Sequence, residues 1–286
     1  MKTRTKPLWL NKKINLGKCA DLDRLFKELS LNTVCRQAHC PNIAECFSAK
    51  VATFLILGRV CTRGCRFCAV EKGKTSDVDK TEPERVAAAV RQLGLRHVVI
   101  TSVTRDDLED GGAQAFYDTV SAIKRLDEGI SVEVLVPDFQ AQRESIEKVL
   151  SCGPEVFAHN VETVPRLYAQ VRSAADYRRS LSVLSMAAKG DKHVHVKSGI
   201  MLGMGETEDE LLSVFDDLRV AGCEFLSIGQ YLAPSKNHFP VQSFIPPEMF
   251  ASYKTEALKR GFKHVESGPY VRSSYHAVEY VTAHSS

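Results

Sequence analysis

Three cysteines lie close together in the segment Cys61-Thr-Arg-Gly-Cys65-Arg-Phe-Cys68, a C-x3-C-x2-C spacing. Three thiolates at this spacing would repel one another or oxidise unless a metal held them. Structural zinc sites usually take four ligands from two paired motifs, and no second pair accompanies this triplet. A four-iron cubane held by three cysteines leaves one iron open, as a substrate-activating cluster requires. Zinc remains the minor alternative, and a disulfide is weaker still.

A second triplet, Cys35, Cys40 and Cys46, precedes the first in the chain and has a C-x4-C-x5-C spacing. Three thiolates again leave one iron without a protein ligand, so a fourth ligand must come from another part of the chain. Six of the nine cysteines therefore fall within one short stretch, which a random distribution would not give.

The remaining cysteines and the composition indicate a reduced, cytoplasmic protein. The cysteine total is odd, 44% of the residues are hydrophobic, and the basic segment 1–18 lacks the apolar stretch of a secretory signal. A disulfide framework is therefore not expected, and segment 1–18 is expected to be a solvated arm. Cys152 and Cys223 are expected to fill the apolar core, whereas Cys19 has no assigned role.

Charge and hydropathy argue against two classes of partner. The formal net charge of +3 is too small and too dispersed to predict binding to nucleic acid. No apolar run approaches the ~20 residues that are needed to cross a bilayer, so no membrane association is expected.

The elements that must position the thiols alternate between strands and helices from Val51 onward. Apolar, β-rich runs occupy 51–57, 97–103, 130–136, 155–161, 194–202 and 224–232. Their nearly continuous apolar character is expected of strands that are covered on both faces. Six strand-then-helix units predict an α/β fold, an open (β/α)6 partial barrel of the TIM type. A short run at 262–267 is expected to close one edge.

Local signals mark where the helices begin and end. Thr81-x-x-Glu84 and Thr207-x-x-Glu210 predict capping boxes, in which a hydroxyl and a carboxylate each bond a free backbone N–H. Glycines that can adopt a left-handed conformation follow the expected helix ends at Gly94, Gly222 and Gly261.

Three segments are expected: an N-terminal extension with the second triplet (1–50), the barrel (51–267) and a C-terminal tail (268–286). Barrels of this kind place their chemistry at the carboxyl ends of the strands. The loop after the first strand is therefore the expected site, and that loop holds the first triplet.

The first triplet, with Phe67 before its last cysteine and placed directly after the first strand, resembles the radical S-adenosylmethionine (SAM) superfamily. The resemblance implies a 4Fe-4S cluster on Cys61, Cys65 and Cys68 whose open iron is chelated by SAM. One electron from the reduced cluster then cleaves SAM and frees a 5′-deoxyadenosyl radical, which removes hydrogen from unactivated carbon. In this interpretation, the cofactors carry the difficult chemistry and the protein positions them.

Both triplets, together with ITSVTRDDLEDGGA (100–113), HNVET (159–163) and VRSSYHA (271–277), resemble the lipoyl synthases over about residues 30–277. The resemblance implies a second 4Fe-4S cluster on Cys35, Cys40 and Cys46. Its fourth ligand would be a serine of the R-S-S-Y motif, Ser274 by preference and Ser273 as the alternative. Alkoxide is a harder and less tightly held ligand to iron than thiolate, which suits a cluster that is opened during the reaction.

In that family, two radical steps insert sulfur at C6 and C8 of an octanoyl chain, and the second cluster is the sulfur source. The implied substrate is an octanoyl-lysine on a lipoyl carrier domain, such as a 2-oxoacid dehydrogenase E2 subunit or the glycine cleavage H protein. A ferredoxin or flavodoxin is the implied electron donor. A biotin synthase-like enzyme is the alternative, but its extra cluster lies within the barrel strands. A non-enzymatic electron carrier or zinc-binding module is the third interpretation.

Four polar residues at expected strand ends are candidates for contacts with SAM. By analogy with the family, Thr101 and Ser102 approach the methionyl part, whereas Asn160 and Glu162 bind the ribose or the amine. The simpler alternatives are ordinary strand-end hydroxyl groups for the first pair and a helix start for the second.

Charged residues near these strands allow weaker predictions. Lys197 lies in an apolar strand, where an unpaired charge would be costly, so the carboxylate of the cofactor is its expected partner. Arg105, Asp106 and Asp107 are expected in a solvated loop and not in an acid–base pair, because radical abstraction needs no paired carboxylates.

Overall fold

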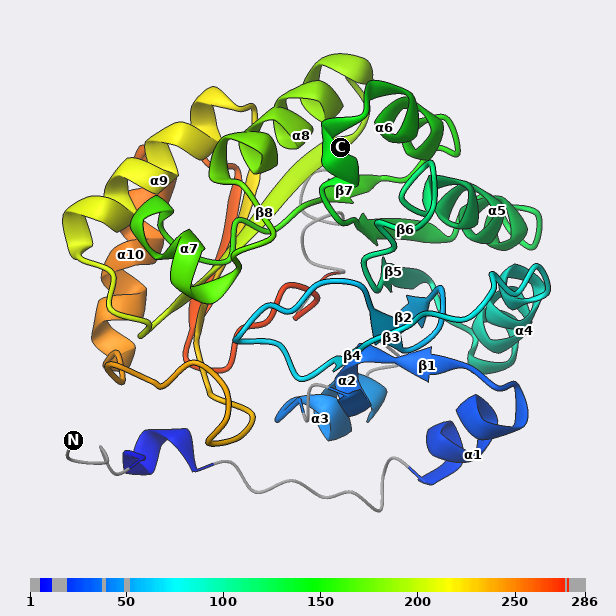
Figure 1. Ribbon diagram of the computed structural model, residues 1–286, viewed down its shortest axis with the longest axis horizontal. Coiled ribbons are helices and arrows are strands. Elements are labelled where there is room, and N and C mark those ends of the chain that lie inside the picture. The colour runs from blue at the N-terminus through cyan, green and yellow to red at the C-terminus, as the bar shows by residue number, and fades with distance from the viewer. Residues whose placement is uncertain (1–5, 12–19, 38–39, 49–51, 276, 278–286) are drawn as a thin grey trace.

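The structure is a computed structural model that describes residues 6–11, 20–37, 40–48, 52–275 and 277, so Cys19 lies outside the described residues. Eight strands form one sheet in the order β1-β2-β5-β6-β7-β8-β9-β10, and only the β1–β2 pair is antiparallel. Figure 1 shows the strands curving around a centre with the long helices outside them. The order runs from β1 to β10 without closing, so the sheet is an open α/β barrel, as the alternation predicts.

The described strands are β1 (Asn32–Thr33), β2 (Thr53–Ile56), β3 (Val60–Cys61), β4 (Glu71–Lys72), β5 (His97–Ser102), β6 (Ser131–Leu135), β7 (Val156–Ala158), β8 (His195–Leu202), β9 (Phe225–Gln230) and β10 (His264–Gly268). The α-helices are α1 (Ala20–Glu28), α2 (Val34–Gln37), α3 (Ile43–Ser48), α4 (Glu82–Leu93), α5 (Ala113–Lys124), α6 (Arg143–Leu150), α7 (Tyr168–Val171), α8 (Tyr177–Gly190), α9 (Glu208–Val220) and α10 (Pro247–Lys259). Short 3-10 turns lie at Leu8–Leu10, Phe139–Ala141 and Pro165–Leu167.

All six strands expected from the apolar runs are present, and the run at 262–267 forms β10 at one edge. The N-terminal extension adds a strand that the sequence does not predict. This strand, β1, has two residues and pairs with the outer edge of β2. The division into extension, barrel and tail stays a prediction.

One of the two expected capping boxes forms. The Thr207 hydroxyl accepts from the Glu210 N–H (3.3 Å), and the Glu210 carboxylate accepts from the Thr207 N–H (2.8 Å). The box expected at Thr81 is wrong. Its backbone is already helical, and its hydroxyl donates to the Asp79 carboxylate (2.7 Å), which competes for the cap.

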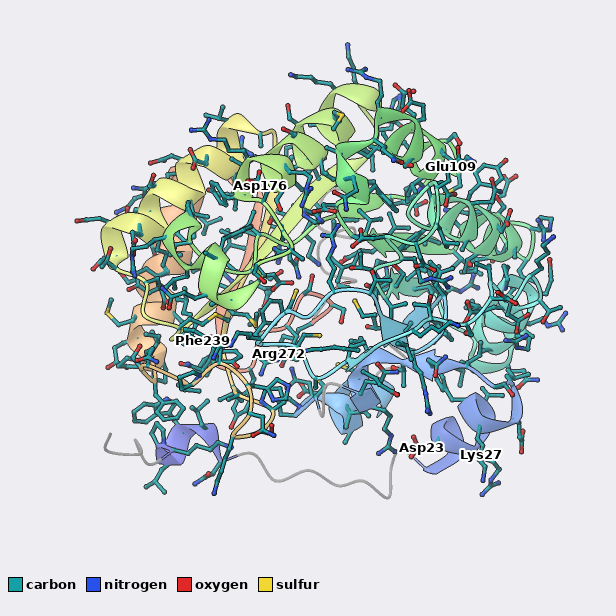
Figure 2. The ribbon with its side chains drawn as sticks, in the orientation of Figure 1. Asp23, Lys27, Glu109, Asp176, Phe239 and Arg272 are labelled. Atoms are coloured by element: carbon teal, nitrogen blue, oxygen red, sulfur yellow. The ribbon has the colours of Figure 1, made fainter. Side chains whose placement is uncertain are left out.

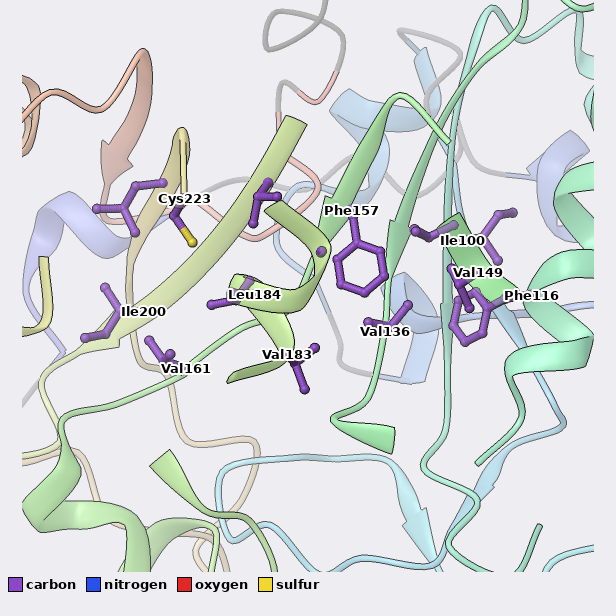
Figure 3. Packing of buried hydrophobic residues seen from close by; sticks show 14 of the residues in the cluster. Ile100, Phe116, Val136, Val149, Phe157, Val161, Val183, Leu184, Ile200 and Cys223 are labelled. Atoms are coloured by element: carbon purple, nitrogen blue, oxygen red, sulfur yellow. The ribbon is translucent and has the colours of Figure 1, made fainter. Parts of the chain in front are cut away.

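The main hydrophobic core lies between the sheet and the outer helices. Figure 3 shows part of this layer, with Phe116 of α5 and Val149 of α6 near Ile100 of β5. Cys223 is completely buried in this core, and Cys152 is partly buried against it, as expected for apolar cysteines. No helix among the described residues is long and apolar enough to cross a membrane.

Candidate active site

The loop with the first triplet follows β2 at the carboxyl edge of the sheet, which is where the barrel geometry predicts a site. Backbone hydrogen bonds fasten it to three other segments of the rim. The donors and acceptors are Thr62 N–H to Thr104 O (3.1 Å), Arg66 N–H to Val171 O (2.7 Å) and Phe239 N–H to Arg66 O (2.8 Å). The loop is therefore held in position by the protein itself.

The three thiols of this loop are half-buried. Burial raises the pKa of Cys65 and raises that of Cys68 to about 11, and the positive charges of Arg172 and Arg63 offset only part of the shift at Cys65. The Arg63 N–H donates to Cys61 Sγ (3.4 Å), and the backbone of Val70 hydrogen-bonds the Cys68 thiol. Thiols in such surroundings become thiolates when a bound metal supplies the positive charge, so the donor set fits an iron–sulfur cluster.

Within the described residues, no three His, Cys, Asp or Glu side chains are arranged to hold one metal ion. A single zinc ion would require sulfurs that converge on one point. A cubane spreads its ligands over several irons, so its cysteines need not converge in this way.

Thr101 and Ser102 end β5 on the same rim. The Thr101 hydroxyl donates to the carbonyl of Leu135 (2.9 Å), so its hydrogen is already used within the sheet. The Ser102 hydroxyl is buried and has no hydrogen-bond partner among the described residues. Since buried hydroxyl groups are normally bonded, Ser102 is the one of the pair with a hydroxyl hydrogen left to donate to a ligand.

Asn160 and Glu162 follow β7, and Asn160 Nδ2 donates to Glu162 Oε1 (3.3 Å). Glu162 has a left-handed backbone (φ 66°), which is unusual for a residue with a side chain, and burial raises the pKa of its carboxyl. Strained backbone of this kind is concentrated at functional sites. Glu162 also interacts electrostatically with Cys65, so both residues lie beside the first triplet.

Arg172 is a candidate residue that the sequence did not reveal. It is only 8% exposed, and its Nη1 donates to the carbonyls of Asn160 (3.0 Å) and Val161 (3.1 Å). Its positive charge acts on both Cys65 and Glu162. Its Nε has no hydrogen-bond partner among the described residues. No spacing or motif marks this arginine, which follows the one-turn helix α7.

Lys197 does not have the partner that its place in an apolar strand predicts. Its ammonium group lies inside the barrel and bonds both carboxylate oxygens of Glu133 on β6 (2.9 and 3.1 Å), and both side chains are completely buried. The charge of Lys197 therefore has its counter-ion within the protein. This ion pair removes the reason for assigning Lys197 to the cofactor.

In the loop at 105–107, Asp106 and Asp107 are exposed, as expected of a solvated loop, whereas Arg105 is buried. Arg105 bonds the Asp107 carboxylate (2.8 Å), while Asp106 bonds Arg63 of the first triplet's loop (2.6 Å). A pocket of about 370 Å³ lies on this side of the rim, and its lining includes Thr104, Asp106, Leu108, Phe139, Gln140 and Gln142. None of the predicted cofactor residues lines this pocket.

The second triplet lies on two short helices of the extension. Cys35 belongs to α2 and Cys46 to α3, and the Cys40 N–H between them donates to the Cys35 carbonyl (2.9 Å). Burial raises the pKa of Cys35 to about 11, although hydrogen bonds with Thr33 and Thr53 oppose the shift. The Cys35 thiol therefore also needs the charge of a bound metal to ionise at neutral pH.

The two serines of the R-S-S-Y motif contact different parts of the site. Thr53 Oγ1 donates to Ser274 Oγ (2.9 Å), and the Thr53 side chain also hydrogen-bonds the Cys35 thiol. Ser273 Oγ donates to Asn160 Oδ1 (3.2 Å), on the side of the first triplet. Two consecutive residues therefore connect the surroundings of both triplets.

The tail between β10 and these serines lies against both ends of the open sheet. Asn42 of the extension donates to the Tyr270 carbonyl (2.6 Å), and the Tyr275 hydroxyl donates to Glu45 (3.0 Å). At the other end, Arg272 donates to the Gln230 carbonyl (3.3 Å) at the end of β9. Figure 2 shows Arg272 near the middle of the molecule, inside the ring of outer helices.

Comparisons with known proteins agree with this geometry. A sequence profile of the Radical SAM superfamily matches residues 55–218. The lipoyl synthase of Geotalea uraniireducens (strain Rf4) is 55% identical over 280 residues, which are 98% of this chain and 99% of that protein. The lipoyl synthase of Geobacter metallireducens (strain ATCC 53774 / DSM 7210 / GS-15) is 58% identical over 275 residues, 96% of this chain and 97% of that protein.

Solved structures resemble the fold at much lower sequence identity. The crystal structure of methylornithine synthase has a TM-score of 0.57 and 14% identity, and the match covers 85% of this chain and 81% of that one. At this identity, the likeness concerns the arrangement of strands and helices and not the substrate.

Proposed function

Because this chain belongs to the lipoyl synthases, a family of radical SAM enzymes, we propose that it inserts sulfur at C6 and C8 of a protein-bound octanoyl-lysine. The product would be the lipoyl group, and the enzyme would be a sulfurtransferase. The substrates would be octanoylated carrier domains, such as those of 2-oxoacid dehydrogenase E2 subunits and the glycine cleavage H protein. A ferredoxin or flavodoxin would deliver the electrons.

One observation supports this proposal more than any other. The chain contains two groups of three thiols, and each group lacks one ligand for a four-iron cluster. The adjacent residues Ser273 and Ser274 of the tail contact the side chains around both groups. An electron carrier would complete its ligand sets with cysteine. Two incomplete sets that are joined in this way suit one reaction that needs both groups.

We assign Cys61, Cys65 and Cys68 to one 4Fe-4S cluster, and Cys35, Cys40, Cys46 and Ser274 to a second. When bound, the first cluster with SAM supplies the radical that removes hydrogen, and the second supplies the sulfide. The contact of Ser274 with Thr53, which also bonds the Cys35 thiol, supports Ser274 over Ser273 as the fourth ligand.

The side chains around the first triplet would hold SAM. Glu162 and Asn160 offer acceptors for the amine and ribose hydroxyl groups, and the unbonded Ser102 hydroxyl offers one further bond. The Arg172 guanidinium keeps one N–H available for a carboxylate beside Cys65. Thr101 would contribute to the shape of the site, because its hydroxyl already bonds Leu135.

Arg272 would serve the second cluster. Its guanidinium donates to the carbonyls of Gln230 and Val271, and burial lowers its pKa while the nearby Cys40 opposes the shift. A buried cation without a carboxylate is costly. The negative charge of a thiolate-held cluster beside Cys40 would offset that cost.

An anaerobic assay with an octanoylated carrier domain, dithionite and SAM tests the function. We expect 5′-deoxyadenosine together with lipoylated carrier. The Cys40→Ala variant should still form 5′-deoxyadenosine but lose sulfur insertion, and the matched Cys152→Ala variant should retain both activities, because Cys152 lies in neither triplet.

Iron analysis provides the second measurement. Two cubanes predict roughly eight irons per reconstituted chain and one predicts roughly four, so Cys40→Ala should lose about half of its iron. Cofactor cleavage without sulfur insertion in the wild-type chain would indicate a different radical SAM reaction, and a chain that takes up no iron would refute the proposal.

A further inference from the structure

Arg63 lies between two of the thiols in the first triplet's loop, and its side chain is 5% exposed. The guanidinium bonds two carboxylates from two neighbouring loops of the rim. Nη1 and Nη2 donate to Asp138 (2.9 and 2.7 Å), and Nε and Nη2 donate to Asp106 (2.6 and 2.7 Å). Both contacts are bidentate, the strongest geometry for arginine and carboxylate.

A second arginine completes this group. The Asp138 carboxylate is completely buried, and its Oδ2 also lies 2.9 Å from Nε of Arg179 on α8. We call Arg63, Asp106, Asp138 and Arg179 the Arg63 network. It contains two positive and two negative charges, so its formal charges cancel. The arginine contacts lower the pKa of Asp138 to about 2, so this carboxylate stays ionised at neutral pH.

The Arg63 network is close enough to the thiols to act on them. The Arg63 N–H is directed at Cys61 Sγ (3.4 Å), and the charge of Arg63 acts on Cys65. The potential of an iron–sulfur cluster depends on the net charge and hydrogen bonds around it. A change of one unit in the charge of the network would therefore shift the reduction potential of a cluster held by this loop.

Arg63 and Asp138 form a buried ion pair, whereas Asp106 and Arg179 are partly exposed. Buried pairs contribute little net stability, because desolvation of the charges offsets their attraction, and exposed pairs also contribute little. Four charges beside one loop therefore suggest a purpose other than stability. We propose that the Arg63 network, by keeping its own net charge at zero, helps to fix the reduction potential of the cluster held by Cys61, Cys65 and Cys68. This inference rests on the proposed function, since it requires that cluster.

In this arrangement, Asp106, Asp138 and Arg179 are positioning residues that act through Arg63. Removal of a negative charge from the network should stabilise the reduced, more negative cluster and raise its potential. Removal of a positive charge should lower the potential. A merely structural role for the network would loosen the loop in either case and would not produce shifts of opposite sign.

The test is an anaerobic potentiometric titration of the holoenzyme, followed by the part of the reduced-cluster EPR signal that changes when SAM is added. We expect a positive shift of the midpoint potential for Asp138→Asn and a negative shift for Arg179→Gln. The matched control is Asp127→Asn, which removes the exposed partner of Arg96 at the opposite edge of the barrel and should cause no shift.

Shifts of the same sign, or shifts no larger than that of Asp127→Asn, would overturn the inference. If Asp138→Asn fails to fold, Arg179→Gln tests the inference alone, because Arg179 does not belong to the loop. A lowered midpoint potential in Arg179→Gln would then support the inference, and an unchanged potential would refute it. Opposite shifts in a chain that makes no lipoyl group would refute only the proposed function. The absence of a SAM-responsive signal in the wild-type chain would refute both.

Discussion

At the scale of single residues, Ser273 and Ser274 show how neighbours in the chain acquire different roles. Their hydroxyl groups bond Asn160 and Thr53, which belong to opposite parts of the site. Residue type alone cannot separate two adjacent serines. Their separation requires the path of the tail, which only the structure provides.

Replacement of each serine tests this difference. We expect Ser274→Ala to reduce sulfur insertion at least tenfold, a loss typical of a removed metal-site group, while cofactor cleavage continues. Ser273→Ala is the matched control and should retain the iron content of the wild-type chain. Equal loss of iron in both variants would contradict the assignment of Ser274.

A buried histidine predicts how stability depends on pH. Burial lowers the pKa of His159 to about 4, and the imidazole is bonded to the Val136 carbonyl and the Ser180 hydroxyl. Between pH 6.5 and 4, the unfolded chain binds a proton that the native imidazole does not, so acidification favours unfolding. For one such group, the loss at pH 5 is about 2 kcal/mol.

The His159→Gln variant should therefore be less stable than the wild-type chain at pH 7 but lose less of its thermal stability between pH 7 and pH 5. Melting temperatures of both proteins at the two pH values measure the effect. His193→Gln, which changes an exposed histidine, should show the full wild-type loss. An identical loss in His159→Gln would disprove the assignment.

At the scale of elements, one of two paired glycines determines where the tail can lie. Gly229 of β9 and Gly268 of β10 face each other in register. A Cβ on Gly229 would collide with the backbone carbonyl of Val271, whereas a Cβ on Gly268 would make an ordinary 3.6 Å contact with the Val271 side chain. Only the first glycine is required for the close approach of the tail.

We therefore expect Gly229→Ala to displace the tail and Gly268→Ala to leave it in place. The first variant should lose about half of its iron and its sulfur insertion, because Ser274 moves with the tail, but it should retain cofactor cleavage. Limited proteolysis after β10 should be faster in Gly229→Ala. Similar digestion of the two variants would argue against a steric role for Gly229.

The two expected capping boxes provide a test of local helix stability. Thr207→Ala removes a cap that is formed and should cost about 1 kcal/mol, which lowers the melting temperature by about 2 °C for a chain of this size. Thr81→Ala removes a hydroxyl that does not cap α4 and should cost clearly less. Thermal unfolding of both variants under the same buffer decides between them.

At the scale of the whole molecule, the sequence predicts most of the barrel because each inner strand is a continuous apolar run. It does not predict β1, since two residues carry no periodic pattern and gain their structure from β2. The Thr81 box fails because Asp79, outside the motif, competes for the hydroxyl.

Polar contacts between residues far apart in the chain are the second feature that the sequence does not predict. Glu133 and Lys197 are 64 residues apart, and Arg63 and Asp138 are 75 residues apart. No local pattern connects such residues, so the partner of Lys197 and the Arg63 network emerge only once the strands are placed. Close spacing made the thiol triplets predictable, and the family resemblance added the serines.

The order in which the ribosome makes the chain has a consequence for the second triplet. Its first cysteine, Cys35, leaves the ribosome long before Ser274, and translation of the residues between them takes roughly 10–50 seconds. Throughout that time, the nascent chain offers three thiols without the tail that contacts their surroundings. The four residues assigned to the second cluster can therefore come together only after Ser274 has been made.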